Sequence, residues 1–223
     1  MDRWARLTWQ AGDPGMLARL LGERIGVAPT PSVSRAGVWD LWLGGELLEV
    51  VPWRREHAGD DPVGDGRLLF EPVMPGELPT GAMGVVGDAG PVGGVELAAV
   101  IWATVDLERA EADLAPWLEP LAGDAPLIDE PHLGGRGRAR ATSALPGSRL
   151  VLLEPTTEGA LAASLARDGE GPCGLYILPG AATPAAASAA RRLAGPLGPS
   201  VRLRSKVRAG PHLLLLAPGT IAS

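Results

Sequence analysis

The sequence predicts an α+β protein built from three tandem strand–helix–strand modules, on the evidence of a repeated strand pattern and of composition. A Gly lies eight residues before a Pro, with an apolar strand between them, at Gly44 to Pro52, Gly147 to Pro155 and Gly210 to Pro218. Three ungapped matches that each close a block of similar layout indicate an internal repeat. The chain has 223 residues, of which 46% are hydrophobic, and can therefore bury a sizeable core.

The first block, residues 1–53, is predicted to hold a strand, a helix and three further strands. Asp13 followed by Pro14 predicts the helix start, because Asp caps helices and Pro suits the first helical position. Apolar residues then recur at helical spacing, and Gly26 ends the run. Two strands joined by Gly44-Gly45 form an expected hairpin.

The segment 54–94 is rich in Gly, Pro and Asp and separates the first block from the rest. We interpret it as a linker that carries one short strand at Leu68-Leu69-Phe70. Long irregular segments inside compact domains often serve a site, so a lid is the alternative.

Residues 95–223 hold the second and third blocks, which are expected to pair as one unit. Asp106 is the predicted cap of the second block's helix, in the same place after a strand as Asp13 in the first block. A linking helix is expected over 156–167, with Thr157 as its cap. The third block is shorter, and we expect it to have lost a strand.

Two stretches carry a family resemblance. Residues 152–155, Leu-Leu-Glu-Pro, lead through the linking helix to 169–175, Gly-Glu-Gly-Pro-Cys-Gly-Leu, and residues 105–110, Val-Asp-Leu-Glu-Arg-Ala, close a first strand. These stretches resemble the vicinal-oxygen-chelate superfamily, which includes glyoxalase I, bleomycin-resistance proteins, extradiol dioxygenases and methylmalonyl-CoA epimerase. The resemblance covers about residues 95–220, and 1–53 through the repeat. It implies tandem βαβββ modules whose curled mixed sheets form a glyoxalase-like cup.

The resemblance also implies where metal ligands would lie: early in each first strand, and four residues before each closing Pro. The residues at these positions are Arg6, Leu48, Ala99, Val151, Gly174 and Leu214. Divalent ions need carboxylate, imidazole or thiolate ligands. We therefore expect no metal and no cofactor, and metal-assisted isomerase, lyase or dioxygenase chemistry is not favoured.

Three polar residues are candidates for the wall of the implied cup. Glu46, Arg149 and His212 each lie six residues before a closing Pro, and side chains two apart share a strand face. His212 would act as acid or base near neutral pH, and Arg149 would clamp a carboxylate or phosphate. The alternative is that all three lie at the solvated rim of the sheet.

Basic residues alternate along two predicted strands. They are Arg136, Arg138 and Arg140 on one strand, and Arg202, Arg204, Lys206 and Arg208 on the other. In a chain of net charge −6, such local stripes predict an anionic ligand. Charged edge strands that resist aggregation are the alternative.

Aromatic residues and the one cysteine offer weaker signals. Trp42 and Trp102 lie on predicted strands and are candidates for stacking against a flat or sugar-like ligand, or else core residues. Cys173 is the only cysteine, so no intrachain disulfide is possible, and we expect it to be inert and buried.

Composition narrows the choice of function. The net charge of −6 argues against nucleic acid as a partner. No apolar run approaches the roughly 18 residues of a membrane span, and no signal core is present, so a cytoplasmic protein without membrane contact is expected.

The first hypothesis for function is a metal-free small-molecule-binding protein of the glyoxalase/bleomycin-resistance type, with an anionic ligand as one option. A metal-independent isomerase or lyase that uses His212 with Arg149 or Glu46 is the second. The third is a structural or interaction protein with a collapsed cup, and a homodimer is an option.

Overall fold

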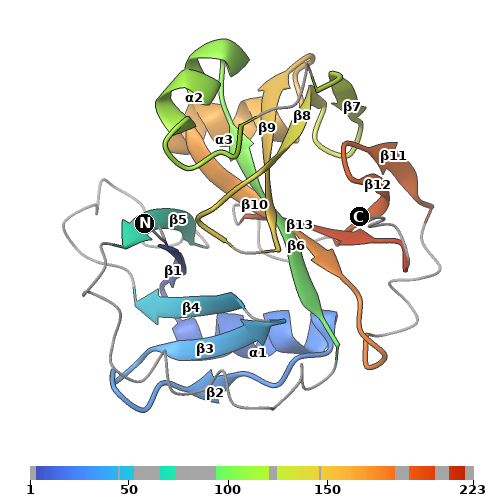
Figure 1. The fold of residues 1–223 in the computed structure, drawn as a ribbon. Coiled ribbons are helices and arrows are strands. Elements are labelled where there is room, and N and C mark those ends of the chain that lie inside the picture. The colour runs from blue at the N-terminus through green and yellow to red at the C-terminus, as the bar shows by residue number, and fades with distance from the viewer. Residues whose placement is uncertain are drawn as a thin grey trace.

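The computed structural model contains a five-stranded sheet and an eight-stranded curled sheet, both mixed, packed against each other (Figure 1). The structure describes residues 4–44, 46–52, 66–73, 94–120, 125–145, 147–183, 191–203 and 211–218. Among these residues no helix is both long enough and apolar enough to cross a bilayer.

The first module has the predicted order of a strand, a helix and three strands. Its elements are β1 (Trp4–Ala11), α1 (Pro14–Ile25), β2 (Thr30–Pro31), β3 (Trp39–Leu43) and β4 (Glu46–Pro52). The Asp13 side chain accepts a hydrogen bond from Met16 N at 2.9 Å, and Gly26 ends α1 at φ 80°, as predicted. β1 pairs parallel to β4, and the sheet order is β2-β3-β4-β1-β5.

The second module repeats this arrangement, and the described residues of the third repeat its four strands. The second holds β6 (Glu96–Ala103), α2 (Leu107–Leu114), β7 (Ile128–Glu130), β8 (Gly135–Ala141) and β9 (Arg149–Pro155). The linking helix α3 (Ala160–Asp168) leads to β10 (Gly171–Leu178), β11 (Leu193–Gly195), β12 (Gly198–Leu203) and β13 (His212–Leu216). β6 pairs parallel to β9, β10 pairs parallel to β13, and antiparallel pairing of β6 with β10 joins the two modules. These pairings confirm tandem βαβββ modules and a glyoxalase-like α+β fold.

Two predictions about these modules were wrong. The third module has not lost a strand, because β11 supplies it, and three residues are too few to show a strand period in the sequence. Thr157 does not cap α3, since the N-cap is Gly159 and no side-chain cap bond forms there. The expected helix after Thr183 lies mostly outside the described residues.

The short strand predicted within 54–94 is confirmed. β5 (Arg67–Val73) pairs antiparallel to β1, just as β10 pairs antiparallel to β6. It therefore takes the place beside the first module that a partner module takes in the eight-stranded sheet. The rest of 54–94, including the possible lid, lies outside the described residues apart from Gly66 and Gly94.

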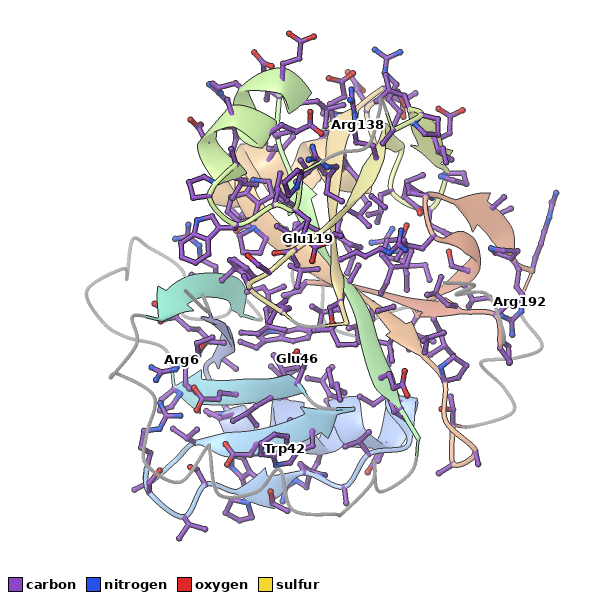
Figure 2. All side chains as sticks on the ribbon, viewed as in Figure 1. Arg6, Trp42, Glu46, Glu119, Arg138 and Arg192 are labelled. Atoms are coloured by element: carbon purple, nitrogen blue, oxygen red, sulfur yellow. The ribbon has the colours of Figure 1, made fainter. Side chains whose placement is uncertain are left out.

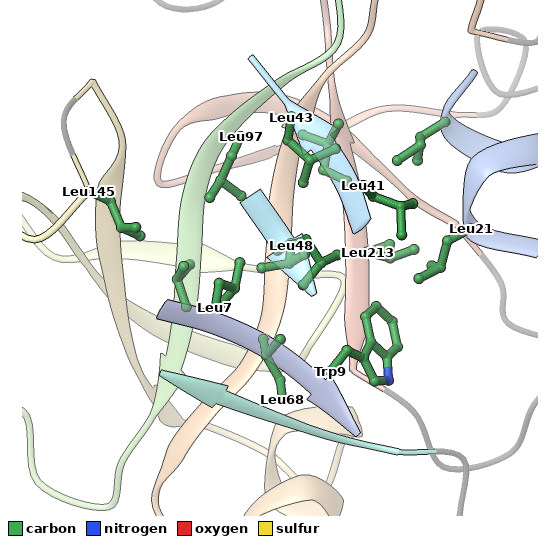
Figure 3. Close-up of a cluster of buried hydrophobic side chains, with 14 of the residues drawn as sticks. Leu7, Trp9, Leu21, Leu41, Leu43, Leu48, Leu68, Leu97, Leu145 and Leu213 are labelled. Atoms are coloured by element: carbon green, nitrogen blue, oxygen red, sulfur yellow. The ribbon is translucent and has the colours of Figure 1, made fainter. Parts of the chain in front are cut away.

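The core divides into two apolar clusters on the two faces of the eight-stranded sheet. The Leu175 face of that sheet carries Val100, Leu150, Leu152, Leu175, Leu213 and Leu215, and it packs on Leu107 and Leu114 of α2. The same cluster continues onto the five-stranded sheet (Figure 3). The Tyr176 face carries Ile101, Val151, Leu153, Tyr176, Leu214 and Leu216, with Leu133 and Leu161 against them. Because the edge strands β7 and β11 contact each other, the sheet nearly closes and the Tyr176 face lines its interior.

Candidate functional site

The two faces of the five-stranded sheet differ in polarity. Leu7 of β1 lies beside Leu48 of β4, and both are buried in the cluster against the eight-stranded sheet. Their chain neighbours Thr8 and Glu49 lie side by side on the opposite face, since side chains alternate along a strand. We call this opposite side the outer face; Trp42 lies on it, turned away from the eight-stranded sheet (Figure 2).

The strand register shows that the ungapped alignment of the three repeats is wrong by one residue in the closing strand of the first block. Arg6 and Ala99 each lie seven residues before a helix-capping Asp. Two residues further on, Thr8 pairs with Glu49 and Ile101 pairs with Val151. The residue that corresponds to Val151 is therefore Glu49, and the ungapped assignment of Leu48 to that position was wrong.

The same offset corrects the placement of Glu46. Glu46 shares a face with Leu48 and lies between the two sheets (Figure 2). Arg149 and His212 instead share a face with Val151 and Leu214, the Tyr176 face of the other sheet. A one-residue slip moves a strand side chain to the other face. Burial raises the pKa of Glu46 from 4.5 to about 7. The structure thus does not bring Glu46 together with His212.

Three polar side chains form a row across the outer face. Asp40 of β3, Glu49 of β4 and Thr8 of β1 are cross-strand neighbours. Thr8 is 6% exposed and Glu49 is 4% exposed. Each of the three has a buried oxygen that lacks a hydrogen-bond partner among the described residues: Asp40 Oδ1, Glu49 Oε2 and Thr8 Oγ1. Since buried polar atoms are normally hydrogen-bonded, this row has hydrogen-bonding capacity left over.

Two arginines hold the central carboxylate of the row. Arg35 pairs with Glu49 Oε1, and Arg6 Nε lies 3.5 Å from Glu49 Oε2, an ion pair without a hydrogen bond. Burial raises the pKa of Asp40, while Arg35 and a hydrogen bond from Ser32 act in the opposite direction. Sequence reasoning missed this row, although the alternation of polar Arg6, Thr8 and Gln10 with apolar residues along β1 was a usable signal.

His212 lies in the interior of the eight-stranded sheet with both ring nitrogens engaged. Arg202 Nη2 is 3.1 Å from Nδ1, and Ser164 Oγ is 3.0 Å from Nε2. A guanidinium only donates, so Nδ1 accepts and Nε2 carries the proton. Burial, reinforced by Arg202, lowers the pKa of His212 from 6.5 to about 4. A neutral imidazole with no free lone pair is poorly suited to acid–base chemistry.

Arg149 is not brought to His212. The two residues lie on the same face, but strands β10 and β6 stand between β13 and β9. The catalytic arrangement of His212 with Arg149 or Glu46 therefore has no support in the geometry.

A second polar pair in the sheet interior was also missed. Tyr176 donates a hydrogen bond to Glu130 Oε2, and His132 N donates to Glu130 Oε1 at 3.0 Å. Burial raises the pKa values of both Glu130 and Tyr176. His132 Nε2 lies 2.8 Å from Ser200 O, so these bonds tie β7 to β12 across the closure of the sheet. The available signal was the chain's single Tyr in an apolar strand, because a buried Tyr hydroxyl needs a partner.

The first arginine stripe lies on the Leu175 face and is paired with acidic residues. Arg136 bonds Glu154 at 2.8 Å, and Arg140 bonds Glu111 of α2 at 2.8 Å. Arg138 Nε lies 3.7 Å from the same Glu111 oxygen. These pairings indicate a role in fastening α2 and β9 to β8. Of the second stripe, only Arg202 lies within the described residues.

The remaining sequence candidates pack inside the protein. Trp102 is partly buried and meets Phe70 of β5 edge to face, with ring centroids 6.3 Å apart. Cys173 is buried, and burial raises the pKa of its thiol to about 12, consistent with an inert residue.

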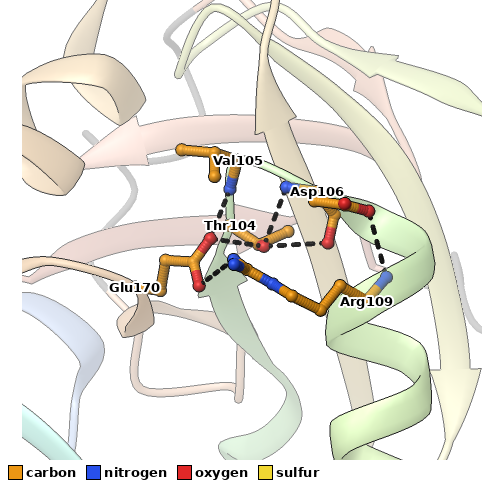
Figure 4. Close-up of polar contacts among 5 residues, drawn as sticks. All are labelled: Thr104, Val105, Asp106, Arg109 and Glu170. Carbon is orange, nitrogen blue, oxygen red and sulfur yellow. Dashed lines mark hydrogen bonds and ion pairs between the residues drawn. The ribbon is translucent and has the colours of Figure 1, made fainter.

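The two stretches that carry the family resemblance contact each other (Figure 4). Glu170 Oε1 accepts hydrogen bonds from Val105 N at 2.8 Å and Thr104 Oγ1 at 2.9 Å, and Arg109 pairs with the same carboxylate. The bond from Val105 N is the main cause of a lowered pKa at Glu170. Asp106 caps α2 by accepting from Arg109 N at 3.0 Å. These residues join the end of β6 to the start of β10 and form a structural motif.

Comparison with known proteins finds similarity to solved structures in fold alone. No family model matches the chain, and no curated protein matches it. Methylmalonyl-CoA epimerase from Mycobacterium tuberculosis is 18% identical over 55% of this chain and 87% of that one, with a TM-score of 0.45. The Streptomyces coelicolor epimerase is 20% identical over 57% of this chain and 97% of that one, with a TM-score of 0.41.

A proposed dioxygenase from Bacillus subtilis matches over a longer stretch. It is 15% identical and covers 96% of this chain and 63% of its own, with a TM-score of 0.34. The assignment of a glyoxalase-like fold rests on the strand order and the parallel pairings of the three modules.

Proposed function

We propose that this protein binds a small molecule on the outer face of its five-stranded sheet and does so without a metal. The single observation that carries the proposal is the row of Asp40, Glu49 and Thr8, whose buried oxygens lack hydrogen-bond partners among the described residues. A buried polar atom without a partner costs on the order of 1–3 kcal/mol. A ligand that supplies the missing hydrogen bonds would remove that cost.

The interior of the eight-stranded sheet supports a structural role instead. Ala99, Val151 and Leu214, which stand at the positions implied for metal ligands, are each 0% exposed and pack in one apolar cluster. Filled interior positions stabilise a fold but offer a ligand little space. This contrast directs the search for a ligand to the outer face.

The donor sets support the proposal that binding is independent of metal. In the paired modules the implied positions hold apolar side chains and Gly174. On the outer face, Glu49 takes the implied position and Asp40 lies beside it, but Glu49 is already paired with Arg6 and Arg35, so positive charge occupies its surroundings. In the part of the chain that the structure describes, no group of three or more His, Cys, Asp or Glu residues could hold a metal ion. The residues present do not fit the divalent ion of the resembled superfamily.

Fragment screening by protein-observed NMR tests the site. A library of small polar compounds is titrated into the ¹⁵N-labelled full chain, and hits are expected to shift amide signals of β1, β3 and β4. Thr8→Val should abolish or weaken these shifts, whereas Leu127→Ala, an exposed apolar position on the eight-stranded side, should leave them unchanged. Hits that shift only signals of β10 and β13 would place the site inside the eight-stranded sheet and overturn the proposal.

Metal dependence is measured on the same hits. Affinity is expected to be equal before and after treatment with EDTA, and elemental analysis of the purified protein should find no stoichiometric divalent metal. Loss of binding on chelation, restored by added metal, would contradict this part of the proposal.

A further inference from the structure

We propose that the ligand of the outer face is a neutral polyhydroxylated molecule, a sugar or a polyol. This inference rests on the proposed function and adds the chemical class of the ligand. It is carried by the balance of charge on the outer face, by the type of its unpartnered atoms, and by the exposed ring of Trp42.

Charge on the outer face is balanced, which favours a neutral ligand. Two guanidinium groups, those of Arg6 and Arg35, surround the carboxylate of Glu49, and Asp40 lies next to it. Strand β5 adds one positive and one negative residue to the outer face. Arg67 lies opposite Gln10, and Glu71 lies opposite Arg6. An anionic ligand would meet the carboxylates of the row, and a cation would have to displace Arg35 from Glu49.

The unpartnered atoms of the row are of types that hydroxyl groups of a ligand would satisfy. Asp40 Oδ1 and Glu49 Oε2 accept hydrogen bonds, while Thr8 Oγ1 both donates and accepts. They belong to side chains on three adjacent strands, so neighbouring positions are separated by about 5 Å. A molecule with several hydroxyl groups has donors and acceptors spread over such a distance and would satisfy the row from β3 to β1.

Trp42 supplies an apolar surface beside the row. It lies two residues after Asp40 in β3 and therefore shares the outer face, and it is 41% exposed (Figure 2). An exposed indole ring next to buried hydrogen-bonding groups suits a ligand with one apolar C–H face and a polar rim, as a sugar ring has. Buried Gln10, two residues after Thr8 in β1, adds an amide to the same face.

The test is isothermal titration calorimetry of the full chain in a buffer free of glycerol and phosphate. D-glucose, D-galactose and myo-inositol are the neutral probes, and sodium lactate and inorganic phosphate are the charged ones. We expect at least one neutral probe to bind. Thr8→Val and Trp42→Ala should each weaken that binding roughly tenfold, the effect of one lost hydrogen bond or ring contact. Leu127→Ala should bind like the wild type.

Each other outcome contradicts the inference in an identifiable way. If no neutral probe binds, or if binding is indifferent to Thr8→Val and Trp42→Ala, the ligand class is wrong. If lactate or phosphate binds instead and depends on Thr8, the class is wrong but the proposed site stands. If the binding of these probes and of every library fragment is unaffected by changes at Thr8 and Trp42, the proposed binding site is wrong. Circular dichroism and melting temperature verify that both variants are folded.

Discussion

Corresponding faces of similar modules differ in this protein: the interior of the eight-stranded sheet is filled, while the outer face of the five-stranded sheet is polar. Ile101 and Val151 inside the larger sheet correspond by register to Thr8 and Glu49 on the smaller one. Both pairs are buried, but the first is apolar, whereas the second carries side-chain oxygens that lack partners within the described residues. A filled interior contributes stability, whereas a buried polar face with unpartnered atoms costs stability that a bound ligand would restore.

Most polar groups that the structure describes inside the larger sheet are hydrogen-bonded, unlike the row on the outer face, although the buried Ser200 Oγ of β12 lacks a partner. Glu130 accepts from Tyr176, and both nitrogens of His212 are engaged. Satisfied buried networks rigidify a fold, whereas partly satisfied ones cost free energy until something completes them. In the part of the chain that the structure describes, the outer face differs from the interior in having unpartnered oxygens side by side on three adjacent strands.

The largest expected effect comes from emptying the filled interior. Leu214→Ala removes a fully buried side chain of the interior cluster, the cross-strand neighbour of Tyr176, and it should lower the free energy of unfolding by about 2–5 kcal/mol. Urea unfolding measures the change, and Leu127→Ala, an exposed position, should stay within about 0.5 kcal/mol of the wild type. A loss below about 1 kcal/mol at Leu214 would mean that the interior is loosely packed and could admit a ligand.

The pH dependence of His212 gives the next largest effect. Its pKa is about 4 in the folded protein, against 6.5 for an unperturbed histidine, so the unfolded chain binds more protons between these two pH values. Stability is therefore fully present above pH 6.5 and is lost as the pH falls towards 4, by roughly 3 kcal/mol. Besides Arg202, the charged groups that act on the ring are Arg167 and Asp168.

His212→Gln isolates this contribution. Unfolding free energies are measured in urea at pH 7 and pH 4.5 for the wild type and the variant. The variant should be less stable at pH 7 and should lose less on acidification. An unchanged difference between the two pH values would show that His212 is not held neutral in the folded state.

Ionisation of Glu46 should change the free energy of unfolding with pH in the opposite direction from His212. Its pKa is raised to about 7, so the folded protein binds more protons than the unfolded chain between pH 4.5 and 7. Stability from the neutral carboxyl is present below pH 4.5 and is lost as the pH rises through 7, by roughly 1–2 kcal/mol after allowance for its partial exposure. Glu46→Gln should therefore stabilise the protein at pH 8 relative to the wild type, and do so much less at pH 4.5. Glu23→Gln, at an exposed carboxylate of α1, controls for removal of one charge.

Sequence patterns predicted the fold well because they record local preferences. Asp13 and Gly26 mark the ends of α1 by capping chemistry, and β3 and β4 pair antiparallel with Leu43 opposite Glu46, as the expected hairpin requires. β11 was missed because Leu193 to Gly195 is too short to carry a period. Local signals identify elements, but they do not fix the register between them.

The candidate site was mostly misplaced for that reason. An ungapped repeat aligned Glu46 with Arg149 and His212, and a single residue of offset puts Glu46 on the opposite face. The row of Asp40, Glu49 and Thr8 depends on contacts across three strands, and the alternation within β1 indicates a polar face but not its neighbours on β3 and β4. Trp42 was selected for its chemistry alone, and the structure places it beside this row, while its role in binding stays a prediction.

The smallest effect distinguishes the two faces most directly. Thr8→Val replaces a buried hydroxyl that lacks a partner among the described residues with a methyl group of the same shape. Removal of an unsatisfied polar group should raise the free energy of unfolding by about 1 kcal/mol, measured in urea without ligand. At the same time the variant should lose affinity for whatever completes the row.

The matched change inside the larger sheet should have the opposite sign. Tyr176→Phe removes a hydroxyl that does have a partner and leaves Glu130 buried with one hydrogen bond fewer, so this variant should be destabilised. If Thr8→Val destabilised the protein as much as Tyr176→Phe, the hydroxyl of Thr8 would be satisfied in solution. The outer face would then be a structural surface like the interior, and the difference between the two faces would disappear.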